Sequence, residues 1–158
     1  MTDFHHVSVL PEETLAALRI RPDGIYVDCT LGGAGHAGRI AAQLSPAGHL
    51  IGIDQDEVAI DAAQERLVAV KCGVTLVHDN FRNLRAILER EGISSVEGIL
   101  FDLGISSPQI DTAERGFSYM QDAPLDMRMD QRSPRSARTV VNEYTADELT
   151  EIFYRYGE

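Results

Sequence analysis

The sequence has 158 residues, of which 44% are hydrophobic and 25% are charged, and these values suit one globular domain. Its formal net charge of −11 argues against nonspecific binding to phosphate backbones, so any contact with nucleic acid has to be local or come from a part not present here. No apolar run reaches the length of a membrane span, and the amino terminus lacks the basic start and apolar core of a signal peptide. We therefore expect a cytoplasmic protein with no membrane partner.

Strand-like and helix-like segments alternate along the first two thirds of the chain. Apolar runs predict strands at residues 25–29, 49–54, 74–77 and 98–103. Helices are expected at residues 11–18, 37–44, 56–70 and 84–90. Continuous apolar strands separated by helices indicate a parallel sheet covered on both faces. The predicted fold class is therefore α/β, a doubly wound parallel sheet, with the fourth strand on the open side of the first.

The alternation stops at Gly104. Residues 104–137 are rich in Gly, Ser, Pro, Asp and Arg, and a loop of that length is commonly functional in a compact domain. A last helix is expected from Thr145, whose spacing to Glu148 suits a capping box.

Four arginines lie in or just after that loop. Arg128, Arg132, Arg135 and Arg138 could meet RNA phosphates. Because Asp126 and Asp130 lie among them, a solvated, self-paired surface is the favoured interpretation. The two cysteines, Cys29 and Cys72, match no metal spacing; we expect Cys29 to be a small buried thiol and no metal to be bound.

A glycine-rich loop at residues 30–36 joins the first predicted strand to the next helix. Glycines let the backbone approach a ligand closely, and a helix start offers unpaired N–H groups to an anion. In S-adenosylmethionine that anion is the carboxylate of the methionine part. Asp54 ends the next strand beside the same crevice, where a carboxylate can accept both ribose hydroxyls. The alternative is that Asp54 only caps a helix.

Residues 33–38 also spell G-x-G-x-x-G, the dinucleotide fingerprint. The pattern is weak in a chain with 13 glycines, and it begins late relative to the preceding strand. An NAD-dependent oxidoreductase domain therefore stays as an alternative.

The fourth predicted strand leads into Asp102 and the loop up to Gln109. Methylation of an exocyclic amine is difficult because the nitrogen lone pair is delocalised into the base, and acceptors aimed at its N–H protons make it more nucleophilic. Asp102 and the turn at Ser106, Ser107 and Pro108 could supply such acceptors, and a simple turn is an equally good interpretation of that segment. His36 lies near the cofactor or caps the helix. Phe81 stacks on adenine or packs in the core.

Five segments together are more specific than any glycine motif. They are His6-Val7-Ser8-Val9-Leu10, Asp28-Cys29-Thr30-Leu31-Gly32-Gly33-Ala34-Gly35-His36, Asp102-Leu103-Gly104-Ile105-Ser106-Ser107-Pro108-Gln109, Glu114-Arg115-Gly116-Phe117-Ser118 and Pro124-Leu125-Asp126-Met127-Arg128-Met129-Asp130. With these segments the chain resembles, over essentially its whole length, the MraW family, also called RsmH. Members of this bacterial family methylate N4 of a cytidine in small-subunit ribosomal RNA.

The resemblance implies a class I (Rossmann-like) methyltransferase that uses S-adenosyl-L-methionine and has ribosomal RNA as its partner; it leaves a homodimer open. The cofactor contacts that it implies are Ala34, Gly35, His36, Asp54, Phe81, Asp102 and Gln109. Asp102, with Ser107 and Pro108, is also expected near the target amine.

Family members are about twice as long as this chain, and we expect it to end inside an inserted helical domain. Residues 1–112 are then an incomplete cofactor-binding half-domain, and residues 113–158 are a loop and the start of the insertion that recognises substrate. A non-catalytic fragment that binds only cofactor is the alternative to an active enzyme.

Overall fold

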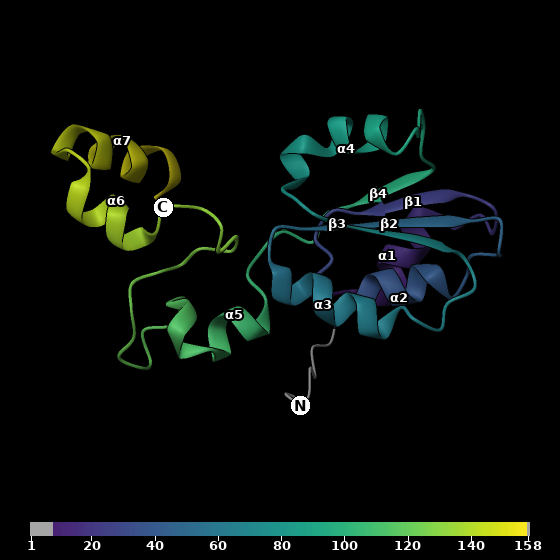
Figure 1. Ribbon diagram of the computed structural model, residues 1–158, viewed down its shortest axis with the longest axis horizontal. Coiled ribbons are helices and arrows are strands. Elements are labelled where there is room, and N and C mark those ends of the chain that lie inside the picture. Colours follow the sequence, from purple (N-terminus) through teal and green to yellow (C-terminus); the bar gives the residue numbers. More distant parts are fainter. Residues whose placement is uncertain (1–7, 158) are drawn as a thin grey trace. The chain divides into compact units, whose positions relative to one another are not determined.

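The computed structural model describes residues 8–157 and divides into two compact units, residues 1–104 and 105–158 (Figure 1). The first two residues of the family-like segment at the amino terminus, His6 and Val7, lie outside the described part. The domain boundary expected after residue 112 stays a prediction.

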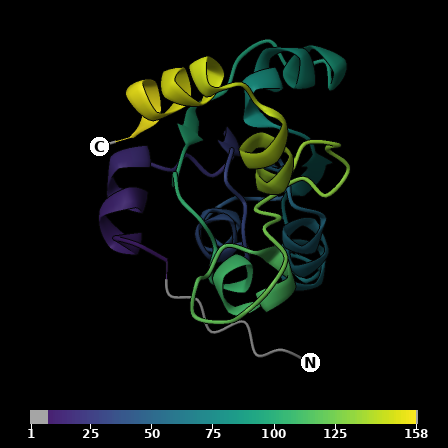
Figure 2. The same cartoon turned by 90° about the vertical axis from the view of Figure 1, so that its left-hand side faces the viewer.

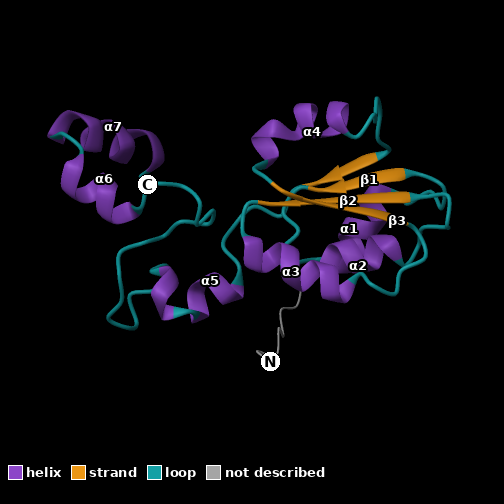
Figure 3. Cartoon of the chain, in the orientation of Figure 1, coloured by secondary structure: helices purple, strands orange, loops and turns teal. Residues whose placement is uncertain are grey.

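The first unit contains a four-stranded parallel sheet in the order β3-β2-β1-β4 (Figure 3). The strands are β1 (Ile25–Asp28), β2 (His49–Asp54), β3 (Gly73–His78) and β4 (Gly98–Leu100). This arrangement confirms the parallel sheet and the place of the fourth strand beside the first. The expectation that the fourth strand runs to residue 103 is wrong. The pairing ends at Leu100 because its partner in β1, Asp28, is the last residue before the chain turns into the glycine loop.

Figure 1 shows α4 on one face of the sheet and α1, α2 and α3 on the other. These helices are α1 (Pro11–Leu18), α2 (Gly35–Ala41), α3 (Glu57–Arg66) and α4 (Leu84–Arg90), the last preceded by the 3-10 turn η1 (Phe81–Asn83). Asp56 caps α3, since its side chain accepts from the Val58 N–H. The third helix ends at Arg66 and not near residue 70, because Leu67 is the last buried position and Val68 is exposed.

Side chains alternate between two cores along the central strands. Tyr26 and Leu50 point into the core under α1, α2 and α3, whereas Val27 and Ile51 point into the core under α4. All four are almost completely buried. This two-sided burial explains why the central strands are continuously apolar, and it fixes the sheet that positions the functional residues.

The second unit contains helices and loops among its described residues. They are α5 (Ser107–Asp111), the 3-10 turn η2 (Ala113–Arg115), α6 (Ala137–Glu143) and α7 (Ala146–Tyr156), the last two being the yellow-green and yellow helices of Figure 2. The expectation of a continuous loop from residue 104 to 137 is wrong, since α5 and η2 lie within it. The capping box of Thr145 and Glu148 at the start of α7 is confirmed.

Over residues 8–157, no helix is both long enough and apolar enough to cross a membrane.

Candidate functional site

Three aspartates lie at the carboxyl edge of the sheet. Asp28 ends β1, Asp54 ends β2, and Asp102 follows β4 by two residues. The strand order changes direction between β1 and β4, and ligands of open α/β sheets bind in the crevice at such a point. The charges of Asp54 and Asp102 both raise the pKa of Asp28, so the three carboxylates are close enough to interact. Throughout the described residues, no group of three or more His, Cys, Asp or Glu side chains is arranged to hold a metal ion.

The glycine loop is tied to the strand beside it. The Leu31 N–H donates to the Ile53 carbonyl at 3.1 Å, and the Gly32 N–H donates to Asp54 Oδ2 at 2.8 Å. Both bonds join the loop after β1 to the end of β2. The loop backbone is therefore fixed in place by the neighbouring strand and its terminal carboxylate.

The same loop has an unusual backbone at two positions. Gly32 has φ 49°, and the buried Ala34 has φ 56°. This left-handed conformation costs a non-glycine residue about 1 kcal/mol, and such strain concentrates where a backbone is shaped for a ligand. At Gly35, the first residue of α2, an added Cβ would collide with Ser8 Oγ. The loop thus has a tight backbone with glycine at residues 32, 33 and 35, as the sequence predicts.

Asp54 braces the loop and does not cap a helix. Its Oδ1 accepts from the Asp56 N–H at 2.9 Å, while Asp56 itself caps α3 by accepting from the Val58 N–H at 3.2 Å. Burial raises the pKa of Asp54, and the hydrogen bonds from Gly32 and Asp56 oppose that rise. The helix-cap interpretation of Asp54 is therefore wrong, and its role toward a cofactor stays a prediction.

Asp28 is a buried carboxyl group that sequence reasoning noted but gave no role. Its exposed fraction is 1%, and burial raises its pKa from 3.8 to about 7. Hydrogen bonds from the backbone and side chain of Thr30 oppose that rise, and the charges of Asp54 and Asp102 add to it. The next residue, Cys29, is a buried thiol as expected, and burial raises its pKa to about 12. The sequence does contain a signal for Asp28, namely an acidic residue within an apolar strand.

Asp102 is positioned by the glycine loop and by α2. Its N–H donates to Thr30 Oγ1 at 2.7 Å, and its Oδ2 lies 3.7 Å from His36 Nε2. The His36 side chain is buried, whereas the Asp102 side chain is 38% exposed. The structure therefore brings together His36, Asp54 and Asp102 from the predicted set. No side-chain cap bond is formed at the start of α2, so His36 faces Asp102 and does not cap the helix.

Phe81 follows β3 at the same edge of the sheet. Its ring meets that of Phe101 edge to face, with centroids 5.5 Å apart and planes at 85°. It also packs against the core under α4. The core interpretation of Phe81 is thus confirmed, adenine stacking stays a prediction, and Phe101 is a partner that sequence reasoning missed.

The predicted residues of the second unit lie at the start of α5. Ser106 is the N-cap, Ser107 and Pro108 form the first turn, and Gln109 completes a capping box in which its Oε1 accepts from the Ser106 N–H at 3.0 Å. The interpretation of this segment as a simple turn is therefore wrong, because the segment begins a helix. Pro108 lies in the first turn of that helix, where proline is favoured. The catalytic roles of Ser107 and Pro108 and the cofactor contact of Gln109 stay predictions.

Two of the four arginines are paired within their own loop. Arg128 makes a bidentate contact with Asp126, with Nη2–Oδ2 at 2.6 Å and Nε–Oδ1 at 3.0 Å. Arg132 pairs with Asp130 at 2.9 Å. The Arg128 side chain lowers the pKa of Asp126 to about 2. The self-paired surface is thus confirmed at Arg128 and Arg132.

The two most specific sequence motifs of the second unit form one structure. The Met127 N–H donates to the Arg115 carbonyl at 2.9 Å, and Arg115 Nη2 donates to the Arg128 carbonyl at 3.0 Å. Gly116 and Met127 both have positive φ, at 71° and 59°. An added Cβ at Gly116 would collide with the Pro124 carbonyl. The two motifs therefore form two loop segments that are packed tightly against each other.

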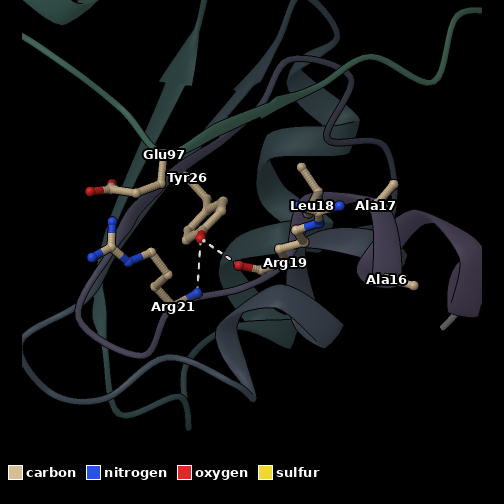
Figure 4. Close-up of a pocket in the computed structure, with 7 residues that line it drawn as sticks. All are labelled: Ala16, Ala17, Leu18, Arg19, Arg21, Tyr26 and Glu97. Carbon is tan, nitrogen blue, oxygen red and sulfur yellow. Dashed lines mark hydrogen bonds between the residues drawn. The ribbon is translucent and has the colours of Figure 1, made fainter.

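A cavity of about 590 Å³ lies at the opposite edge of the sheet (Figure 4). It is lined by Ala16, Ala17, Leu18, Arg19, Arg21, Tyr26 and Glu97. Arg21 and Glu97 precede β1 and β4, so this cavity is at the amino ends of the strands. The Tyr26 hydroxyl accepts from the Arg21 N–H at 2.8 Å and donates to the Arg19 carbonyl. The cavity is separate from the aspartates, and the Tyr26 hydroxyl within it has both a donor and an acceptor as partners.

The last glycine of the dinucleotide-like pattern lacks the packing role expected of it. In an NAD site that glycine permits close contact between helix and strand. At Gly38 an added Cβ would meet only Arg66 Nε at 3.9 Å, an ordinary contact. This spacing does not support the NAD alternative.

Comparisons with known proteins point to one family. Residues 3–158 match the model of the MraW methylase family. The chain is 57% identical to the protein named ribosomal RNA small subunit methyltransferase H from Brevibacillus brevis, over 98% of this chain and 49% of the relative. It is also 57% identical to the protein of the same name from Clostridioides difficile, over 99% of this chain and 50% of the relative. The chain thus spans about half the length of these curated relatives.

The fold is also seen in a solved structure. The crystal structure of a candidate rRNA methylase from Clostridium thermocellum superposes with a TM-score of 0.56 at 19% identity, covering 64% of this chain and 54% of the other. The fold is the predicted class I, Rossmann-like arrangement, incomplete in this chain.

Proposed function

Because the chain belongs to the MraW methylase family, we propose that its first unit binds S-adenosyl-L-methionine and serves a methyltransferase acting on the N4 amine of a cytidine in small-subunit ribosomal RNA. The observation that carries this proposal is the convergence of the glycine loop, Asp54 and Asp102 at the switch point of the sheet.

The site is suited to this cofactor in shape and in charge. Gly32, Gly33 and Gly35 carry no side chain, so a ligand at these positions of the loop would meet bare backbone. The cofactor carries a sulfonium and an ammonium group, and three aspartates end or follow β1, β2 and β4 at this edge of the sheet, of which Asp28 is buried and Asp102 is exposed. Opposite charges in a largely buried site attract more strongly than in water. The demethylated product has lost the sulfonium charge, so we expect it to be held less tightly.

Asp54 is suited to hold the ribose. The carboxylate accepts backbone N–H groups from Gly32, Asp56 and Gln55, and it has about four lone-pair sites in all. The site that remains can accept a ribose hydroxyl. Phe81 would contribute an apolar ring for adenine and Ala34 the adjoining backbone.

Asp102 is suited to act on the target amine. S-adenosyl-L-methionine supplies a methyl group activated by the adjacent sulfonium. An amine N–H bonded to the exposed carboxylate of Asp102 would be more nucleophilic as positive charge develops on nitrogen. His36, 3.7 Å away, restrains the same carboxylate. We propose Ser107, through its carbonyl before Pro108, as a second acceptor, and Gln109 as a cofactor contact in addition to its cap.

A methylation assay tests this function. The chain, and a full-length family member with the same residues, are incubated with unmodified small-subunit RNA and labelled cofactor, and the modified nucleoside is identified by mass spectrometry. We expect N4-methylcytidine from the full-length protein and at least about a hundredfold less from its Asp102→Ala variant. Undiminished product from that variant would remove Asp102 from the mechanism, and a methyl group on another atom would contradict the proposed substrate.

The second candidate function is cofactor binding without turnover. It is favoured by the finding that the chain spans about half of its relatives, because the missing half can carry RNA-binding and sheet-completing residues. Binding of S-adenosylhomocysteine by a chain that gives no product supports this candidate, whereas turnover by the chain alone contradicts it.

A further inference from the structure

Thr30 connects the buried and the exposed aspartate of the site. Its Oγ1 accepts from the Asp102 N–H at 2.7 Å, and its own N–H donates to Asp28 Oδ1 at 3.1 Å. Both bonds are partly buried. One residue in the glycine loop thus links the end of β1, through its backbone N–H, with the segment after β4, through its side chain.

The position of this hydrogen bond explains why Asp102 needs it. The pairing between the neighbouring strands continues as far as the Cys29 N–H, which donates to the Leu100 carbonyl at 2.9 Å. Asp102 lies beyond this last backbone bond. Its N–H would otherwise have no strand to pair with, and Thr30 Oγ1 takes the place of the missing backbone carbonyl. The direction of the Asp102 carboxylate is therefore set from the loop after β1.

Asp28 fixes Thr30 by accepting its hydrogen bonds. The hydroxyl of Thr30 has one proton to donate, and its hydrogen bond to Asp28 is among the interactions that lower the pKa of that carboxyl. An ionised carboxylate accepts more strongly than a neutral one. The titratable groups around Asp28 are Asp54 at the end of β2, Asp102 after β4 and the adjoining Cys29; His36 of α2 faces Asp102.

We infer that Thr30 is the positioning residue for Asp102, and that Asp28, Thr30 and Asp102 form one hydrogen-bonded chain that joins the cofactor loop to the acceptor for the target amine. The inference rests on the proposed function for the role of Asp102, but the hydrogen-bonded chain itself exists without ligand. Thr30 touches neither cofactor nor substrate in this account, and it acts through Asp102.

Two substitutions of Thr30 separate its hydroxyl from its shape. Thr30→Val keeps the shape and removes the hydroxyl, whereas Thr30→Ser keeps the hydroxyl. Amide hydrogen exchange of Asp102, measured by NMR on the ligand-free chain, reports the bond directly. We expect exchange of this one amide to become about tenfold faster in Thr30→Val, with Thr30→Ser within about threefold of the parent chain. Equal exchange in the parent chain and Thr30→Val, or equally fast exchange in both variants, would overturn the inference.

The affinity for S-adenosylhomocysteine is a second readout. We expect Thr30→Val to bind it about fivefold to tenfold more weakly than the parent chain, and Thr30→Ser to restore the affinity. Equal affinities in all three chains would overturn the positioning role. Circular dichroism shows whether Thr30→Val folds. If it does not, the amide exchange of Asp102 in the parent chain still tests the inference, because an unprotected Asp102 amide contradicts the hydrogen bond to Thr30. Failure of the parent chain to bind the ligand, with a protected Asp102 amide, would instead count against the proposed function.

Discussion

Replacing Asp28 by Asn should make the chain more stable above neutral pH. The carboxyl is 1% exposed, and its burial beside two other carboxylates raises its pKa from 3.8 to about 7. A rise of that size corresponds to about 4 kcal/mol, at about 1.4 kcal/mol for each pH unit. Asn has nearly the same shape, and its carbonyl can still accept from the Thr30 N–H, but it cannot ionise. We expect a gain of about 2–4 kcal/mol at pH 8, since local relaxation reduces the full value.

The sign follows from the direction of the pKa change. A carboxyl whose pKa is higher in the folded than in the unfolded state favours folding while it is protonated, at or below its unfolded pKa. That contribution is lost as the pH rises from about 4 through about 7, so the parent chain loses free energy of unfolding over this range. Asp28→Asn should not show this loss.

Urea unfolding of the ligand-free chain between pH 4.5 and 8, followed by circular dichroism, measures the difference. Asp61→Asn is the matched control, because Asp61 is exposed on α3, and it should follow the pH dependence of the parent chain. If Asp28→Asn and the parent chain lose stability in parallel as the pH rises, Asp28 is ionised throughout and the argument from burial fails.

Three further predictions concern local structure. Gly116→Ala should lower the free energy of unfolding by more than about 2 kcal/mol, because a Cβ there meets backbone atoms. Gly92→Ala, at the same φ of 71° but with open space around it, should lower it by about 1 kcal/mol. Equal losses in urea unfolding would refute the packing argument. Arg128→Lys should lower the midpoint of urea unfolding through loss of the bidentate contact with Asp126, and an unchanged midpoint would show that the pair contributes little. Thr145→Ala should reduce stability by about 1 kcal/mol and fray the first turn of α7, and unchanged helicity by circular dichroism would contradict the role of the cap.

The parts of the fold that depend on local pattern could be predicted from the sequence. The central strands bury both faces, so their apolar runs are unbroken, and Pro11 and the Thr145 capping box mark helix starts by short-range chemistry. The end of the fourth strand could not be predicted this way, because Leu103 is apolar yet 72% exposed. Where a strand ends depends on its partner, and that is a property of the tertiary structure.

Site residues could be predicted from the sequence where they lie at the ends of strands. Hydrogen bonds between residues far apart in the sequence could not be predicted. Asp54 was found from its place after the second strand, but its bond to Gly32 spans 22 positions and Thr30 lies 72 positions from Asp102. No sequence period reports such contacts. Asp28 had a readable signal, a charge inside an apolar strand, whose meaning depends on the two carboxylates that the topology brings beside it.

The most direct test of the central claim is calorimetric titration of the chain with S-adenosylhomocysteine and with NAD, for the parent chain, Asp54→Asn and the exposed control Asp61→Asn. We predict that the parent chain and the control bind S-adenosylhomocysteine in preference to NAD. Asp54→Asn should bind it at least about tenfold more weakly, because the amide nitrogen can accept neither from the Gly32 N–H, which fixes the loop, nor from a ribose hydroxyl. Preference for NAD, or equal affinity of Asp54→Asn and the parent chain for S-adenosylhomocysteine, would contradict the account.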